Sequence, residues 1–128
     1  MATSALWQGE GGCGDLAAVR VGVQCSFLGK RVVLQEKEWQ HILSRHRYFR
    51  DPDMEAALME AIRNPRCITD NALPGVKVAY YGAAPPPYRP TDLVKVAVLV
   101  KRRVGIVLTA HHETSVPPKE VVLWGTRP

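Results

Sequence analysis

The sequence predicts an α+β fold, in which two helices of the N-terminal half pack on a curved antiparallel sheet of about four to six strands. Apolar residues repeat with a helical period in two stretches before residue 65, and strand-forming runs follow them without further helices. The 128 residues suffice for one domain. We expect a flexible Gly-rich N-terminal tail over residues 1–18 and a single α+β domain over residues 19–128.

The two helices are predicted from their periodicity and their end signals. The first is expected from about Gln35 to His46, where one face of a 3.6-residue period holds Trp39, Ile42, Leu43 and His46. The second begins at Asp51-Pro52, which combines a capping carboxylate with a proline at the first helical position. An apolar stripe follows, and Asn64-Pro65 ends the helix.

Strand-forming stretches lie on both sides of these helices. Short β-prone or alternating runs and two long apolar runs occupy residues 19–23, 31–34, 67–69, 76–81, 93–100, 104–110 and 121–124. The proline-rich segment 83–90 cannot be a central strand, because proline has no N–H to donate to a neighbouring strand. The long apolar runs therefore predict adjacent central strands joined by a turn at residues 101–103.

Cysteine usage and hydropathy exclude several classes of protein. Cys13, Cys25 and Cys67 are an odd number without C-x-x-C spacing, which favours reduced thiols over a disulfide scaffold or a zinc finger. The sequence has no run of about 18 apolar residues and no basic start of a secretory signal. We expect a cytoplasmic protein that does not associate with membranes.

The charge balance indicates a polyanionic partner. All 17 Lys and Arg residues lie within residues 19–128, against ten Asp and Glu residues there. Such an excess attracts nucleic acid through its phosphates, although it also serves simply to keep a surface soluble. The residues that we expect to contact RNA are Lys77, Lys101, Arg102 and Arg103.

The first predicted helix carries three candidate catalytic residues. His46 lies within its apolar stripe, where it is either a core histidine or a group that lines a cleft. His41 and Arg45 lie one turn apart on the opposite face, as plain surface residues or as a functional pair. An imidazole beside a guanidinium suits phosphoryl chemistry, which needs a proton shuttle near pH 7 and a cation for the transition state.

A second group of polar residues ends the last long strand. Thr109, His111 and Glu113 alternate onto one face of this strand, and His112 onto the other. Adjacent histidines on a strand point apart, so we do not expect a metal site here. The alternative to a catalytic role is a polar strand end that frays into the following loop.

Lys95 interrupts an apolar run, which is unusual because burial of an unpaired ammonium group is costly. Its side chain either extends to a sheet edge or lines a cleft that binds an anion. A two-residue hairpin loop would pair Lys95 with Ala110 and place it beside His112, whereas a three-residue loop would set it opposite Thr109.

Three short segments carry a resemblance: the helix motif W-Q-H-I-L-S-R-H, a helix ending A-I-R-N-P and a strand ending V-L-T-A-H. Together they resemble the phage-associated branch of the barnase–EndoU–colicin–RelE-like nucleases and a neighbouring family of small uncharacterised proteins with an H-x-x-x-R helix. The match covers roughly residues 31–114. It implies a RelE/barnase-like fold and metal-independent RNA cleavage without a cofactor, as a toxin or effector with a cognate inhibitor or antitoxin protein.

The resemblance assigns roles by position. His41 and Arg45 match the H-x-x-x-R element, His46 the second histidine of the helix motif, and Thr109 the threonine of the last strand. His111 stands where the resemblance leads us to expect an aromatic residue. The implied reaction is attack of the ribose 2′-hydroxyl on phosphorus, with a histidine as base and a second acid for the leaving group, to give a 2′,3′-cyclic phosphate.

Two placements of the reacting centre stay open at this point. In the first placement, His46 and Thr109 act together in a cleft between helix and sheet. In the second, His41 and Arg45 act at the helix edge. Arg45 and Lys95 would together stabilise the anionic transition state. Two other functions are also compatible with the sequence: a non-catalytic module that binds nucleic acid or a partner on the same fold, and a pure protein-interaction domain.

Overall fold

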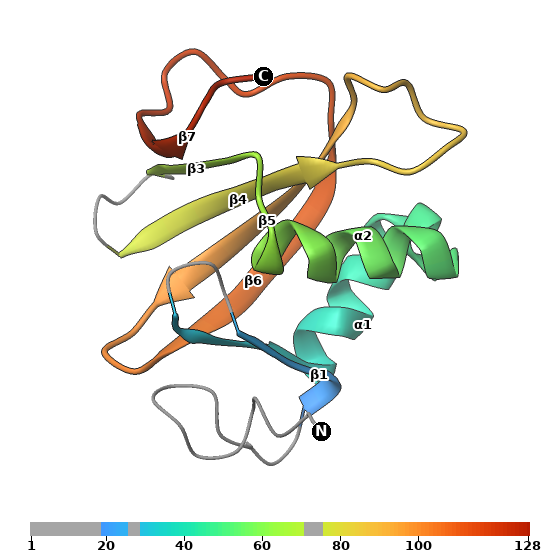
Figure 1. Ribbon diagram of the computed structural model, residues 1–128. Coiled ribbons are helices and arrows are strands. Elements are labelled where there is room, and N and C mark those ends of the chain that lie inside the picture. Colours follow the sequence, from blue (N-terminus) through green and yellow to red (C-terminus); the bar gives the residue numbers. More distant parts are fainter. Residues whose placement is uncertain (1–18, 26–28, 71–75) are drawn as a thin grey trace.

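The computed structural model describes residues 19–25, 29–70 and 76–128, which form one sheet with two α-helices against one of its faces (Figure 1). The helices are α1 (Glu36–Arg45) and α2 (Pro52–Arg63), with the 3-10 turn η2 (Arg47–Arg50) between them. The strands are β1 (Val19–Cys25), β2 (Arg31–Gln35), β3 (Cys67–Asp70), β4 (Lys77–Ala83), β5 (Leu93–Val100), β6 (Val104–Glu113) and β7 (Val122–Gly125). The predicted α+β class is confirmed.

The sheet is mixed and mostly antiparallel, with the strand order β1-β2-β6-β5-β4-β3-β7. It has seven strands where four to six were expected, because all the stretches named above join one sheet. The expectation of a wholly antiparallel sheet is also corrected, since β2 runs parallel to β6. The helices lie between these two strands in the chain, and a crossover of this kind allows two neighbouring strands to run in the same direction.

Both helices begin and end close to the predicted positions. The side chain of Asp51 accepts a hydrogen bond from the backbone N–H of Asp53 at 2.9 Å, and Pro52 is the first residue of α2. These two features satisfy the free backbone groups of a helix start. His46 is the C-cap of α1 and its backbone N–H donates to the carbonyl of Ile42 at 2.7 Å, which fixes the place at which the chain leaves the helix.

The main core lies between the helices and the sheet. It is built from large apolar side chains of both layers, including Leu34, Trp39, Ile42, Phe49, Met54, Leu58, Ile62, Ile68, Val94, Val96, Val98 and Val107. A smaller cluster lies on the opposite face of the sheet and consists of Cys67, Ala79, Tyr81, Leu93 and Val116. Cys67 is a free and buried thiol, and burial raises its pKa.

Gly82 allows α2 to pack closely on β4. A Cβ atom at this position would lie 2.7 Å from the Cβ of Ala61, a distance that atoms of two side chains cannot adopt without a shift of the backbone. Both residues are therefore small where the helix crosses the strand.

A bulge in β6 sets the register of the central hairpin. Near the turn, Val98 pairs with Val107, but Ala97 pairs with Thr109, so Leu108 is an extra residue without a partner in β5. Lys95 therefore lies opposite His111. Both predicted registers for Lys95 were wrong, because each assumed a regular ladder from the turn to the end of the strand.

The predicted N-terminal tail, residues 1–18, lies outside the described residues. None of the described helices is long and apolar enough to cross a membrane.

Candidate active site

Near the end of β6, the structure brings together two of the predicted site residues, His46 and His111. β2 pairs with β6 over residues 104–106 and then leads into α1, so beyond Ile106 it is α1 that packs beside β6. The end of α1 and the turn η2 thereby come close to the strand end that carries His111 and His112. Strand β6 continues to Glu113, so this segment is ordered strand and the prediction of a frayed polar end was wrong.

The first group at this edge consists of His46, His111 and Glu113. The ring centroids of His46 and His111 lie 5.7 Å apart, and the Nε2 of His111 lies 2.6 Å from a carboxylate oxygen of Glu113. Because a carboxylate only accepts, this contact places a proton on Nε2 of His111 and fixes the orientation of its ring. One imidazole is thus held by a carboxylate, while the other faces it without such a partner.

The environment of His46 favours its neutral form. Partial burial lowers the pKa of His46, and the nearby positive charges of His111, Arg45 and His41 lower it further. Arg45 and His41 are exposed on α1. A neutral imidazole at pH 7 can accept a proton, so the structure gives His46 the protonation state of a general base.

The second group lies on the helix side of the strand end. The hydroxyl of Tyr48 accepts a hydrogen bond from the backbone N–H of His112 at 2.8 Å, and the Nε2 of His112 lies 3.1 Å from Asp92. The contact with His112 lowers the pKa of Asp92. The ring of Tyr88 lies 4.8 Å from that of His112, and the ring of Tyr48 lies 5.6 Å from that of His46. The two groups are therefore connected through Tyr48.

Lys95 belongs to neither of these groups. Its Nζ lies 2.7 Å from a carboxylate oxygen of Glu120, whose other oxygen accepts hydrogen bonds from Thr69 at 2.7 Å and Tyr81 at 2.6 Å. Burial alone would raise the pKa of Glu120, but these three hydrogen bonds together lower it. The expectation that Lys95 reaches a sheet edge or binds an external anion is corrected, because the ammonium group is buried against a carboxylate of the same chain.

Thr109 is separated from His46. It pairs with Ala97 on the face away from the helices, in the row that also contains Ala79 and Thr69. A cleft between helix and sheet that contains both His46 and Thr109 is therefore excluded for the described residues. His111 does reach His46, because His111 lies near the end of β6 and His46 lies at the end of α1, which packs beside that strand.

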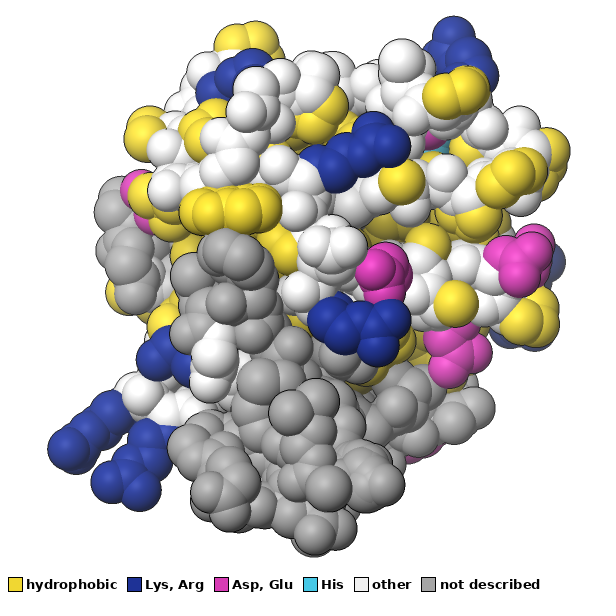
Figure 2. All heavy atoms as spheres, viewed as in Figure 1, with side chains coloured by type: hydrophobic (Ala, Val, Ile, Leu, Met, Phe, Trp, Pro, Cys, Tyr) yellow, Lys and Arg dark blue, Asp and Glu magenta, His cyan; other side chains and the backbone are white. Residues whose placement is uncertain are grey.

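The four residues expected to bind RNA gather at the other end of the sheet. Lys101, Arg102 and Arg103 are exposed at the turn between β5 and β6, and Lys77 lies opposite Leu99 near that turn. Figure 2 shows basic side chains that project from this turn at the lower left. Arg103 and His111 are eight positions apart along the chain, which in a strand corresponds to about 25 Å.

Sequence reasoning missed Tyr48, Tyr88, Asp92 and Glu120, which hold the histidines and the lysine in place. These residues lie in turns and loops, where no periodic pattern indicates a partner. One signal was available: Asp92 and Glu120 each stand beside an apolar strand, and a buried carboxylate requires a donor.

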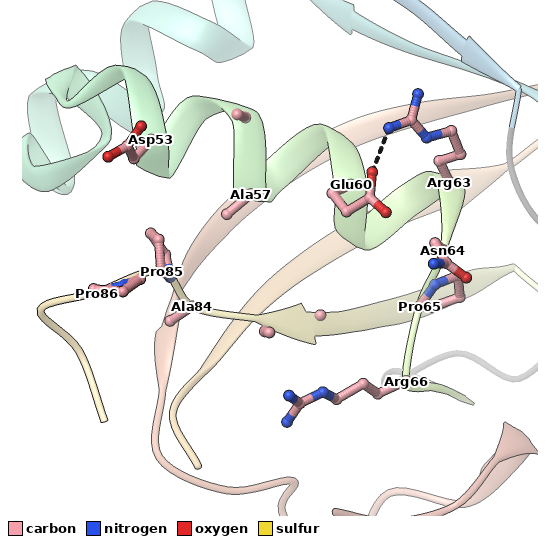
Figure 3. Close-up of a pocket in the computed structure, with 13 residues that line it drawn as sticks. Asp53, Ala57, Glu60, Arg63, Asn64, Pro65, Arg66, Ala84, Pro85 and Pro86 are labelled. Atoms are coloured by element: carbon pink, nitrogen blue, oxygen red, sulfur yellow. Dashed lines mark hydrogen bonds and ion pairs between the residues drawn. The ribbon is translucent and has the colours of Figure 1, made fainter. Parts of the chain in front are cut away.

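A groove of about 860 Å³ lies away from these groups, between α2 and the end of β4 (Figure 3). Asp53, Ala57 and Glu60 line it from the helix, and Ala84, Pro85 and Pro86 from the strand end and the proline-rich segment. Glu60 is paired with Arg63. None of the predicted site residues lines this groove.

Comparison of the chain with protein-family models, curated proteins and solved structures finds no match. The resemblance to the barnase–EndoU–colicin–RelE-like nucleases therefore stays a prediction. Within the described residues, no group of three or more His, Cys, Asp or Glu side chains is arranged to hold a metal ion.

Proposed function

We propose that the protein is a metal-independent endoribonuclease of the toxin type, which cleaves RNA by attack of the ribose 2′-hydroxyl on the adjacent phosphorus. The observation that carries this proposal is the facing pair of histidines, His46 and His111, with ring centroids 5.7 Å apart. Their surroundings differ: His46 has a lowered pKa, and Glu113 accepts a hydrogen bond from His111. Two histidines that face each other in different surroundings are a suitable arrangement for paired acid–base catalysis.

In the proposed reaction, His46 takes the proton from the 2′-hydroxyl, whose oxygen then forms a bond to phosphorus. The bond from phosphorus to the 5′-oxygen breaks, and protonated His111 donates a proton to that oxygen. The products are a 2′,3′-cyclic phosphate and a free 5′-hydroxyl. Glu113 keeps the ring of His111 in place through the 2.6 Å contact between their side chains. The requirement for a 2′-hydroxyl selects RNA over DNA.

Arg45 is the cation that we assign to the anionic transition state. It is exposed at the last turn of α1, immediately before His46, and its charge acts on that imidazole. His41 lies one turn earlier on the same helix. Lys95 has no direct role in this scheme, since Glu120 neutralises it.

The test is incubation of the purified full chain with RNA in EDTA, followed by detection of 2′,3′-cyclic phosphate ends. We expect His46→Ala and His111→Ala to reduce cleavage about 10²- to 10⁴-fold. Lys37→Ala, which alters an exposed lysine on α1, is the matched control and should cleave like the wild type. RNA that stays intact at high protein concentration would refute the proposal, and loss of cleavage in His41→Ala with retention in His46→Ala would move the reacting centre to the helix edge.

A second candidate function is RNA binding without cleavage. The observation that favours it is the basic turn formed by Lys101, Arg102 and Arg103, which lies far from the histidines. Binding that weakens with salt and persists in the double variant His46→Ala/His111→Ala, without any cleavage by the wild type, would support this function.

A further inference from the structure

We propose that Tyr88 and His112 form a stacking platform for an unpaired nucleobase, so that the protein binds single-stranded RNA beside the histidine pair. This inference rests on the proposed function and adds to it the class of substrate. It concerns side chains outside the acid–base pair, in the proline-rich loop and on the helix side of β6.

The platform is made of two aromatic rings at a stacking distance. The rings of Tyr88 and His112 have centroids 4.8 Å apart and planes inclined by 34°. Both side chains are only half-buried, so part of the ring surface is open to solvent. Tyr48 lies against both rings, with centroid distances of 6.3 Å to Tyr88 and 6.4 Å to His112. Exposed aromatic faces on a basic protein are the features with which single-stranded nucleic acid is bound.

Hydrogen bonds hold the platform rigid. Asp92 contacts the Nε2 of His112 at 3.1 Å, and its backbone links the two ends of the loop, since its N–H donates to Arg89 and its carbonyl accepts from Ala84. The backbone N–H of Tyr88 donates to the carbonyl of Pro85 at 3.0 Å. A ring that is already fixed loses little conformational freedom when a base stacks on it.

The platform lies where an RNA strand bound at the histidine pair would place a neighbouring base. Tyr48 contacts His46 on one side and the platform on the other, so a base on Tyr88 would belong to a nucleotide near the reacting phosphate. Arg89 follows Tyr88 in the chain, and its side chain is mostly exposed although its Nε lies 3.7 Å from Asp92. The exposed part of the guanidinium could contact a phosphate of the same RNA strand. A base within a duplex is stacked on both faces and paired at its edge, so it cannot reach the platform.

Binding of short single-stranded DNA provides a test that does not depend on cleavage, because DNA lacks the 2′-hydroxyl. We expect Tyr88→Ala to bind a short oligodeoxynucleotide about 5- to 150-fold more weakly than the wild type, the range found when one stacking side chain is removed. Tyr88→Phe keeps the ring and should bind like the wild type. Trp124→Ala removes an exposed aromatic side chain on the distant edge strand β7 and should also bind like the wild type. A thermal melt of each variant shows whether the fold is kept.

Three results would overturn the proposal. The first is equal affinity of Tyr88→Ala and the wild type for the oligodeoxynucleotide, and the second is a loss of affinity in Trp124→Ala as large as that in Tyr88→Ala. The third is equal affinity of the wild type for the single strand and for a duplex of the same sequence. The failure of this inference differs from failure of the proposed function. Tyr88-dependent binding without RNA cleavage would support the platform and refute the nuclease, whereas cleavage that Tyr88→Ala leaves unchanged would support the nuclease and refute the platform.

Discussion

Two glutamate contacts lie side by side on one face of the sheet and differ in how far their side chains are exposed to solvent. Lys95 and His111 are cross-strand neighbours, and each contacts a glutamate: Lys95 with Glu120, and His111 with Glu113. The side chains of the lysine pair are 10% and 7% exposed, whereas those of the histidine pair are 29% and 30% exposed. Similar chemical groups thus differ mainly in their exposure to solvent.

The buried pair is held by several hydrogen bonds. One oxygen of Glu120 accepts from Thr69 and Tyr81 and the other from Lys95, and both side chains of the pair are almost fully removed from solvent. The open pair leaves the ring of His111 facing a second imidazole. A charged residue in an apolar strand therefore indicates a buried partner of opposite charge, here Glu120 for Lys95.

The largest effect is expected from Lys95→Met, which leaves the buried Glu120 carboxylate without its cation. Breaking a buried ion pair in this way typically costs about 3–5 kcal/mol of unfolding free energy. Lys101→Met, at the exposed hairpin turn, is the matched control and should change stability by less than about 0.5 kcal/mol. Urea unfolding at pH 7 measures both values.

The double variant Lys95→Met/Glu120→Gln sharpens this prediction. Removing both charges takes away the unpaired carboxylate, so the double variant should be more stable than Lys95→Met alone. Lys95→Met with wild-type stability and no RNA cleavage would contradict the distinction between the two pairs, since Lys95 would then act in the reaction.

Glu113→Gln is expected to have the next largest effect, and on rate rather than stability. The side chain keeps its shape but loses the charge-assisted hydrogen bond with His111, a loss of about 1.5–3 kcal/mol or roughly ten- to hundredfold in kcat/KM. Single-turnover cleavage of RNA measures the rate. A fall in unfolding free energy as large as that of Lys95→Met would show that this pair is structural as well.

On acidification, the two regions should lose their contributions to the unfolding free energy at different pH values. The pKa of His46 is lowered from 6.5, so its stabilising contribution is present above pH 6.5 and is lost as pH falls through the lower folded value. The pKa of Glu120 is lowered from 4.5, so its contribution holds to pH 4.5 and declines only below it. Between these two values, His46→Gln should abolish part of the pH dependence of unfolding. The double variant Lys95→Met/Glu120→Gln should leave it unchanged, because it removes both the carboxylate and the ammonium group of the buried pair.

The lowered pKa of His46 also predicts how the cleavage rate falls at acidic pH. If neutral His46 is the base, kcat/KM for RNA should fall on acidification with a midpoint below pH 6.5, the ordinary value for histidine. A midpoint above pH 6.5 would assign the limb to another group.

The smallest effect is expected from neutralising the hairpin turn. Changing Lys101, Arg102 and Arg103 to Gln removes exposed charges about 25 Å from His111 and should hardly change the cleavage step. If these residues bind phosphates of single-stranded RNA, the slope of log affinity against log salt should decrease by about 0.7 for each phosphate that the variant no longer binds. An unchanged slope would exclude the turn from the RNA interface.

The sequence predicted those features of the fold that depend on local patterns. The Asp51-Pro52 start of α2 and the strand-forming runs are local signals, and they were confirmed. The pairing of Lys95 with Glu120 joins residues 25 positions apart, and it depends on a loop whose course no periodicity predicts. The register depends on one unpaired residue, Leu108, which is an ordinary apolar residue in an apolar run. The candidate site is difficult to predict for the same reason, because the bulge at Leu108 determines that His111 lies opposite Lys95.

The edge of β6 that β2 does not pair with has a consequence for solubility. An exposed row of backbone donors and acceptors is a template on which a strand from another molecule can add. At His112, the N–H that faces away from β5 donates to the hydroxyl of Tyr48 at 2.8 Å. Tyr48 thus occupies a backbone donor with which a strand of another molecule could otherwise pair.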